Sequence, residues 1–253
     1  MRRLFLCALA QVMALAAFSQ VNVQLHYDLG SATNPNSEAN RQKVTTTVEM
    51  FKADRLGSTY FFIDMDYRSK TDAATTRGVL GAYWEVSRDF TFAKVRDTAH
   101  SFTAHAEYNG GLNVVGPFQQ ALLVGPAWQW HSGDFSKTFT LQAMYKQFLK
   151  GNGLDPVAGA QFTAVWGVTF ANRFCTFAGF ADLWYGPKAN SASNGMVFLT
   201  EPQFWVNLNA IKGWGKVNLS IGTEWEISNN FVWRTAKDRT CFWNPTVALK
   251  WTI

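Results

Sequence analysis

Residues 21–29 (VNVQLHYDL) alternate apolar and polar side chains without interruption. Successive side chains of an extended strand point to opposite faces, so this stretch predicts a strand with one apolar face and one polar face. The alternation returns through the chain as far as its last residues, where Leu249, Trp251 and Ile253 share one face. Such a pattern is typical of a transmembrane β-barrel, whose wall meets lipid outside and a polar interior inside.

The amino terminus has the parts of an export signal. Two arginines directly after the first residue form a charged region, residues 4–18 form an apolar run, and Ser19 ends a small-x-small cleavage motif. The apolar run is short for a membrane anchor, and no stop-transfer pattern follows it. We therefore expect a cleaved signal peptide over residues 1–19 and one outer-membrane domain over residues 20–253. Cys7 is removed with the signal, so a lipid anchor is not expected.

Composition separates the barrel from the other classes of protein. The mean hydropathy is −0.10, and no later segment holds the roughly twenty apolar residues of a transmembrane helix. Aromatic residues make up 15% of the chain, with 11 Trp and 21 Phe. A soluble β-protein would have to bury most of these rings, whereas a barrel displays them in girdles at the two membrane interfaces. The predicted fold class is therefore all-β, a transmembrane antiparallel up-and-down barrel.

The alternating segments predict twelve strands. They cover residues 21–29, 43–51, 58–68, 78–86, 101–109, 120–131, 137–147, 159–170, 175–185, 196–208, 216–227 and 241–253. An even number of strands returns the chain to the side on which it began, as closure of a single-chain bacterial barrel requires.

Long and short connections alternate between these segments. The long ones, expected on the extracellular side, are 31–42, 69–77, 110–118, 150–158, 186–195 and 228–240. The short ones, rich in turn-forming residues and expected in the periplasm, include 52–57, 132–135, 171–174 and 212–215. Residues 87–99 are too many for a tight turn, so a strand extension or a folded periplasmic segment is expected there.

Strand parity assigns side chains to the two faces of the wall. The lipid-facing set includes Val21, Val23, Leu25, Tyr27, Leu29, Val44, Val48, Met50, Phe61, Ile63, Met65, Trp84, Val86, Leu122, Val124, Trp128, Val217, Leu219, Ile221 and Trp225. The lumenal carboxylates and histidines are His26, Asp28, Glu49, Asp64, Asp66, Glu85, His105, Glu107, Asp182, Glu201, Glu224 and Glu226. The lumenal bases are only Lys43, Arg68, Lys146 and Lys250. A chain with a net charge of +5 is thus predicted to have an acidic interior.

Aromatic residues of lumenal parity accompany these acids, with Phe180 and Trp184 near Asp182. Rings beside hydrogen-bond acceptors are suited to a planar, hydrogen-bonding solute, because a base stacks on an aromatic face while carboxylates accept hydrogen bonds from ribose hydroxyls or amines. The same rings would equally serve to plug the bore. The residues expected to contact solute in the lumen are Tyr60, Phe62, Asp64, Asp66, Tyr83, Glu85, Glu201, Gln203, Trp205, Glu224 and Glu226.

Three short motifs resemble a known group of proteins. Residues 83–90 (YWEVSRDF), 107–113 (EYNGGLN) and 125–128 (GPAW) are similar to a group of uncharacterised outer-membrane proteins of Bacteroides-like bacteria. That group resembles the nucleoside-specific (Tsx-like) channel porins, which are monomeric twelve-stranded barrels with a narrow nucleoside-binding passage. The resemblance implies a barrel and nucleoside-like solutes, and it assigns no individual binding residue.

Few residues are suited to catalysis or metal binding. The four histidines lack metal-ligand spacing with cysteines or carboxylates, and nucleophile-elbow, P-loop and dinucleotide motifs are missing. His105 with Ser101, or His131 with Ser132, would lack a third partner. The chain is therefore predicted to be no enzyme and to carry no cofactor or metal. Cys175 and Cys241 begin strands at opposite ends of the predicted barrel, so both should be free thiols on the lipid-facing parity.

The sequence leaves two hypotheses for function. The first is a monomeric channel of the bacterial outer membrane that lets small neutral or cationic solutes, nucleosides among them, diffuse through an acidic and aromatic lumen. Its partners would be outer-membrane lipid, lipopolysaccharide and the solute, with no nucleic-acid polymer. The alternative is a plugged barrel that acts in structure or adhesion and binds a partner or surface glycan through its loops. The last loop offers aromatics and bases for this, namely Phe231, Trp233, Arg234, Lys237 and Arg239.

Overall fold

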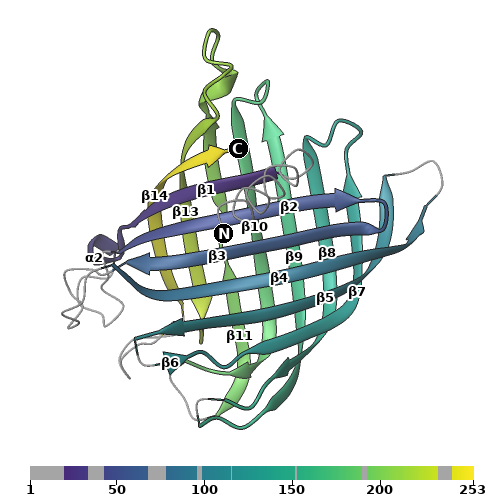
Figure 1. The fold of residues 1–253 in the computed structure, drawn as a ribbon, viewed down its shortest axis with the longest axis vertical. Helices are drawn as coiled ribbons and strands as arrows, with labels where there is room; N and C mark the ends of the chain where they lie inside the picture. The colour runs from purple at the N-terminus through teal and green to yellow at the C-terminus, as the bar shows by residue number, and fades with distance from the viewer. Residues whose placement is uncertain are drawn as a thin grey trace, which may run out of the picture.

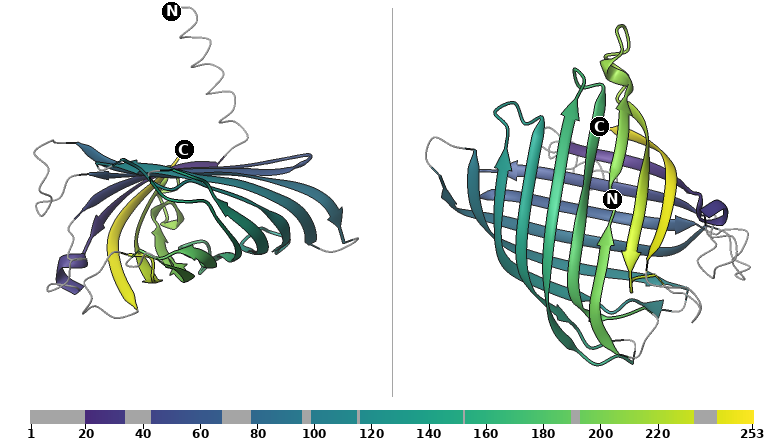
Figure 2. Two further views of the ribbon diagram at one scale, coloured as in Figure 1. Left: turned by 90° about the horizontal axis from the view of Figure 1, so that it is seen from below. Right: turned by 180° about the vertical axis from the view of Figure 1, so that it is seen from behind.

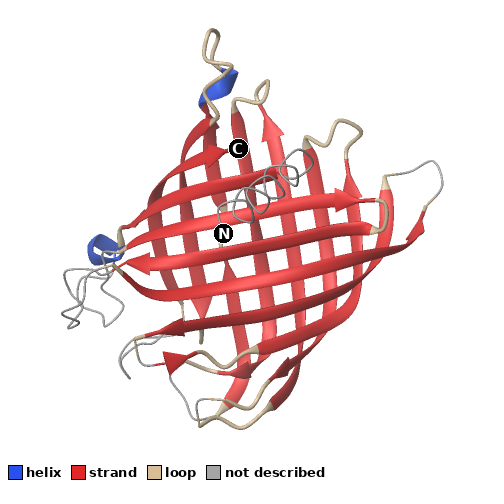
Figure 3. Cartoon of the chain, viewed as in Figure 1, coloured by secondary structure: helices blue, strands red, loops and turns tan. Residues whose placement is uncertain are grey.

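The computed structural model describes residues 20–33, 43–67, 78–95, 99–114, 116–151, 153–189, 193–232 and 241–253. Nearly all of their regular structure is strand, as Figure 3 shows. The helices within these ranges are single turns, α2 (Gly30–Thr33) and η1 (Leu208–Ala210). None of the helices in the described ranges has the length and apolarity to cross a membrane. The predicted signal peptide lies outside the described residues.

The strands form one closed sheet. They are β1 (Gln20–Asp28), β2 (Val44–Asp54), β3 (Gly57–Tyr67), β4 (Val79–Lys94), β5 (His100–Asn113), β6 (Gly116–Pro117), β7 (Ala121–His131), β8 (Lys137–Phe148), β9 (Val157–Phe170), β10 (Cys175–Pro187), β11 (Asn194–Thr200), β12 (Gln203–Asn207), β13 (Leu219–Asn229) and β14 (Phe242–Thr252). Apart from β6, β11 and β12, neighbouring strands along the chain pair antiparallel, and β1 pairs with β14. The short β6 only extends β5, and β11 and β12 are two parts of one strand between β10 and β13. The predicted closed barrel of twelve antiparallel strands is therefore confirmed.

The two stretches whose alternation was most regular meet at the closure of the barrel. Leu25 of β1 pairs with Leu249 of β14, and both are about half exposed, at 48% and 49%. Their neighbours of opposite parity, Gln24 and Ala248, are buried at 1% and 5%. The apolar face of each strand thus points out of the barrel and the other face points in, as the alternation predicts.

The barrel has two broad walls that face each other across the interior. In Figure 1 strands β1 to β5 run across the front, and β8 to β13 run behind them in a steeply crossing direction. The view from below in Figure 2 shows these front and back walls as separate layers. We call the end with Gln20, the β2–β3 turn and Thr252 the turn end, and the end with Asp28 and the long connections the loop end.

Several strands have other bounds than the alternation alone predicted. β4 continues to Lys94, so residues 87–94 are a strand extension that carries Asp89 on the inner face. β5 likewise continues to Asn113 and pairs with β6, within the predicted loop 110–118. Val217 lies in the connection before β13, so its predicted place in a lipid-facing strand is wrong.

The predicted strand 196–208 is interrupted between β11 and β12. Pro202 has no N–H to donate to a ladder, and the strands separate there. Gly179 of β10 lies opposite the break with a φ of 151°, and a Cβ at this position would come within 2.5 Å of the Glu201 carbonyl oxygen. Glycine is therefore required where the broken strand comes this close to β10.

Cys175 and Cys241 are both free thiols. Cys175 pairs with Phe170 at the turn end, whereas Cys241 directly precedes β14 at the loop end. The prediction that the barrel keeps them apart is confirmed.

An ion pair fastens the β2–β3 turn to β4 on the outer face of the turn end. The guanidinium of Arg88 donates hydrogen bonds of 2.7 and 2.8 Å to the two carboxylate oxygens of Asp54. The backbone N–H groups of Leu56 and Gly57 donate to the same carboxylate at 2.8 and 3.1 Å. These hydrogen bonds, with that of Arg88 the strongest, lower the pKa of Asp54 to about 2.

Replacing the Asp54 carboxylate should therefore lower the free energy of unfolding at neutral pH but not at strongly acidic pH. A carboxyl whose pKa is lower in the folded state stabilises the fold above its unfolded pKa, about 4, and loses that effect as pH falls to its folded pKa. We expect Asp54→Asn to lower the free energy of unfolding at pH 7 and the difference to disappear between about pH 4 and pH 2. Urea unfolding in detergent micelles measures this, with Asp155→Asn on an exposed loop as control. A difference that does not change with pH would assign the effect to something other than the charge.

Candidate functional site

The inner face of the barrel carries many carboxylates and few bases. Those of inner parity on the described strands and at the break before β12 are Asp28, Glu49, Asp64, Asp66, Glu85, Asp89, Glu107, Asp182, Glu201, Glu224 and Glu226, against Lys146 and Lys250, with Lys43 directly before β2. Arg68, a predicted lumenal base, lies outside the described residues. Because the wall is a low-dielectric medium, it focuses the field of these charges into the interior.

Hydroxyl and amide donors hold the carboxylates of the front wall in place. Glu49 accepts hydrogen bonds from Asn22 at 2.8 Å and from the Tyr60 hydroxyl at 3.2 Å. On β4 the Tyr83 hydroxyl donates to Glu85 at 2.6 Å. Each of these oxygens accepts from a fixed neighbour, so the carboxylates are oriented before any solute arrives.

Asp64 and Asp66 stand nearer the loop end of the same wall. The Thr47 hydroxyl donates to Asp64 at 2.5 Å, and the Thr45 hydroxyl donates to Asp66 at 2.7 Å. Lys43 forms an ion pair with Asp66 at 3.1 Å. The two predicted acids of β3 are therefore held by hydrogen bonds from side chains of β2. Of the two, only Asp66 has a lysine partner within 4 Å in the described part of the chain.

Three predicted aromatic residues form a continuous stripe on the front wall. The ring centroids of Tyr60 and Phe62 are 6.0 Å apart, and those of Phe62 and Tyr83 are 5.9 Å apart. Tilted rings at this spacing make favourable contacts. The hydroxyl groups at the two ends of the stripe donate to Glu49 and Glu85. The stripe thus presents ring edges and faces between two carboxylates.

Trp205 lies at the centre of a second group of lumenal residues, on the back wall. Its indole N–H donates to Gln203 at 2.9 Å, and the Gln203 amide donates to Glu224 at 2.5 Å. Trp205 is fully buried, and the ammonium of Lys250 lies 3.9 Å from the centre of its ring. The His26 ring meets the indole edge-on at 6.1 Å. Three of the predicted lumenal residues therefore form one hydrogen-bonded chain.

The two other predicted carboxylates of this wall are Glu201 and Glu226. Glu201 stands at the break before β12, where its backbone N–H donates to the Phe180 carbonyl at 3.1 Å. Glu226 lies two residues beyond Glu224 on β13 and pairs in register with Asn244 of β14. The predicted set thus divides between the front-wall stripe and the Trp205 group.

The sequence reasoning missed most of the apolar residues inside the barrel, although it placed Trp184 on the lumenal face. Ala121, Leu123 and Met144 form one buried cluster on the inner face of β7 and β8. A second consists of Trp184, Val197 and Leu199 on β10 and β11, and Phe148 packs against both. The available signal was residues 121–124 (ALLV), a run in which both faces of the strand are apolar. The back wall is therefore apolar near the loop end, where the front wall carries Asp64 and Asp66.

The last loop approaches this apolar region. The Phe231 ring meets the Trp184 ring edge-on at 5.8 Å. The other predicted binding residues of that loop, Trp233, Arg234, Lys237 and Arg239, lie outside the described residues.

His105 is bound between two carboxylates of the inner face. Its ring nitrogens lie 3.1 Å from Asp89 and 3.0 Å from Glu107. The His131 ring nitrogen lies 2.9 Å from the backbone carbonyl of Ser132 rather than its hydroxyl. Neither histidine therefore activates the neighbouring serine considered from the sequence. Asp89 was not placed on the inner face from the sequence, because the strand extension was only one of two alternatives for residues 87–99.

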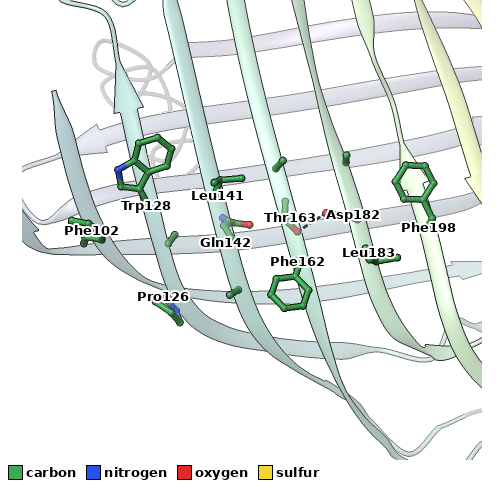
Figure 4. Close-up of a pocket in the computed structure, with 14 residues that line it drawn as sticks. Phe102, Pro126, Trp128, Leu141, Gln142, Phe162, Thr163, Asp182, Leu183 and Phe198 are labelled. Atoms are coloured by element: carbon green, nitrogen blue, oxygen red, sulfur yellow. Dashed lines mark hydrogen bonds between the residues drawn. The ribbon is translucent and has the colours of Figure 1, made fainter.

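Figure 4 shows a hollow on the back wall. Most of its bulky lining residues have outward parity, namely Phe102, Trp128, Leu141, Phe162, Leu183 and Phe198. Phe162 is 59% exposed. The hollow is thus part of the apolar outer surface rather than of the lumen, and it agrees with the predicted outward position of Trp128.

A closed barrel with an apolar outer belt and a polar, charged interior is the architecture of outer-membrane porins. The chain belongs to the family described as a domain of unknown function, DUF5020, whose model matches residues 20–253. No curated protein matches the sequence.

One solved structure, the NanC porin, shows the same fold at low sequence identity. The chain is similar to the NanC porin, with a TM-score of 0.56 and 10% identity over 92% of this chain and 100% of that one. A structure from work on in-meso crystallisation of membrane proteins gives a TM-score of 0.47 and 8% identity over 93% of this chain and 83% of that chain. For OccK2 (OpdF) of Pseudomonas aeruginosa the TM-score is 0.27, with 7% identity over 93% and 97%. The predicted relation to nucleoside-specific channels stays a prediction.

Proposed function

We propose that this chain is a channel of the bacterial outer membrane through which small neutral or cationic solutes diffuse passively. The excess of carboxylates over lysines on the inner face carries this proposal. A passage lined with negative charge attracts cations and repels anions of the same size. In this proposal residues 1–19 are removed after export, the mature barrel works as a monomer among lipid and lipopolysaccharide, and it catalyses no reaction.

Partial exposure of the inner face supports a passage with room for solute. All residues of β3 are partly exposed, including the inward Phe62 and Asp64. Val165 of β9 has the same inward parity as the buried Thr163 and is nevertheless 40% exposed. Space inside the wall is therefore reached by solvent at the front wall and on β9.

Nucleosides are the specific solutes that we propose. The stripe of Tyr60, Phe62 and Tyr83 offers aromatic surface for a base, and Glu49 and Glu85 at its ends accept hydrogen bonds from ribose hydroxyls or exocyclic amines. Such sites must bind weakly enough to release the solute again.

Uptake into proteoliposomes tests this proposal. We expect adenosine to enter at least about tenfold faster than its 5′-monophosphate, because the phosphate adds negative charge in an acidic passage. Heat-modifiable migration on gels verifies that the barrel is folded. Equal entry of the nucleoside and the nucleotide would contradict the acidic selectivity, and entry of neither would favour the plugged barrel.

A further inference from the structure

Two lysines inside the barrel place their charge over tryptophan rings. The ammonium of Lys250 lies 3.9 Å from the centre of the Trp205 ring. The ammonium of Lys146 lies 4.6 Å from the ring centre of Trp184 and 5.1 Å from that of Phe148. A cation this close to an aromatic face is attracted by the negative charge of the ring face, most strongly where water is excluded.

The Trp205 ring is fixed so that one face is covered by the wall. Gly222 of β13 lies beneath it, and a Cβ there would come within 2.4 Å of the indole. The hydrogen bond to Gln203 fixes the rotation of the ring. Lys250, on the next strand, contacts the ring and forms no hydrogen bond or ion pair with the part of the chain that the structure describes. Glu49 and Glu224 are the carboxylates whose charge acts on this ammonium.

Lys146 occupies a similar site nearer the loop end, where its ammonium has more contacts. Its ammonium donates to the Gln161 side-chain oxygen at 2.7 Å, and the two residues are only 8% and 5% exposed. The Phe148 ring lies against Gly186 of β10, where a Cβ would come within 2.4 Å of the ring. Two aromatic rings and an amide oxygen therefore surround one buried cation.

We propose that both places are binding sites for organic ammonium ions, filled by lysines of the protein itself. The inference rests on the proposed channel and adds protonated or quaternary amines as a class of solute that these two places would bind. A passing ammonium ion takes the place of the lysine on the ring while the lysine swings away on its flexible stem. One cation replaces another, so the carboxylates nearby keep a positive partner. The tethered lysine competes with the solute and keeps its binding weak, as conduction requires.

Removing the competing lysine should expose the site to an external cation. We expect Lys250→Met, which keeps an unbranched apolar stem, to lower the concentration of tetramethylammonium that half-blocks potassium current about tenfold. Lys43→Met removes an inner lysine that is paired with Asp66 rather than placed over a tryptophan ring, and should change the block much less, through the general effect of one charge. Trp205→Leu added to Lys250→Met should restore wild-type block, and Lys250→Arg should resemble wild type.

If Lys250→Met and Lys43→Met changed the half-blocking concentration of tetramethylammonium equally, the inference would be overturned, because the effect would then be one of charge in general. Calorimetric titration of the folded variants in micelles with tetramethylammonium separates this inference from the channel itself. Tighter binding by Lys250→Met without any current would retain the ammonium site and reject the channel. Current whose block and binding do not respond to Lys250→Met would reject the site and retain the channel.

Discussion

Replacing Asp64, Asp66 and Glu85 together by Asn, Asn and Gln should lower the ratio of cation to anion permeability at least about threefold. The three carboxylates lie on the inner face of β3 and β4. The substitution of Asp66 also removes the ion-pair partner of Lys43, which adds an uncompensated positive charge. The measurement is the reversal potential of the current under a salt gradient in a planar bilayer.

The size of this effect follows from Coulomb's law. A unit charge 8 Å from a permeating ion contributes about 0.5 kcal/mol in a water-filled passage, so three contribute about 1.5 kcal/mol, or roughly tenfold. Screening at 0.1 M salt, where the Debye length is about 10 Å, reduces the effect to about threefold. Asp134→Asn in the exposed β7–β8 turn is the control and should change nothing. If the triple variant kept the wild-type ratio of cation to anion permeability, these three acids would not contribute to the charge selectivity of the lumen.

Phe162→Arg on the outer face should lower the free energy of unfolding by about 2–4 kcal/mol, whereas Phe170→Arg should cost about 0–1 kcal/mol. Both residues have outward parity on β9 and are exposed, at 59% and 44%. Phe162 lies within the strand, and Phe170 ends it at the turn. An arginine at the middle of the hydrocarbon layer cannot reach water, but one at the interface can.

Guanidinium unfolding in liposomes measures both free energies under the same conditions. The two variants share a strand, a face and a substitution, so they differ only in depth. Equal costs would show that this face of β9 is not embedded in a bilayer at the depth that the barrel implies.

Alternation predicted most of the strands because each strand has lipid on one side and a polar interior on the other. β1 and β14 were located to within a residue for this reason. For residues 87–99 the sequence left a strand extension and a folded segment open, although the alternation continues through Asp89, Phe90 and Thr91. The charged pair Arg88-Asp89 resembled a turn, whereas Arg88 points outward to Asp54 and Asp89 points inward to His105.

Parity placed lumenal residues on a face but did not show which of them meet. Trp205 contacts Lys250 because β12, β13 and β14 are in a register that sets Trp205 beside Gly222 and Gly222 beside Ala248. Such register depends on loop lengths and on the break at Pro202, and a single sequence carries too little information on either. The inner apolar clusters were missed for a different reason, since a polar interior was assumed for every strand.

Liposome swelling tests most directly whether the lumen is a continuous passage. Proteoliposomes with the folded wild-type protein are diluted into an isotonic solution of a small neutral sugar. A continuous lumen predicts swelling that is faster than that of empty liposomes and that slows as the solute becomes larger. Heat-modifiable migration on gels verifies that the protein is folded and inserted. If these proteoliposomes then swell no faster than empty liposomes, the claim that the lumen is a continuous passage is contradicted.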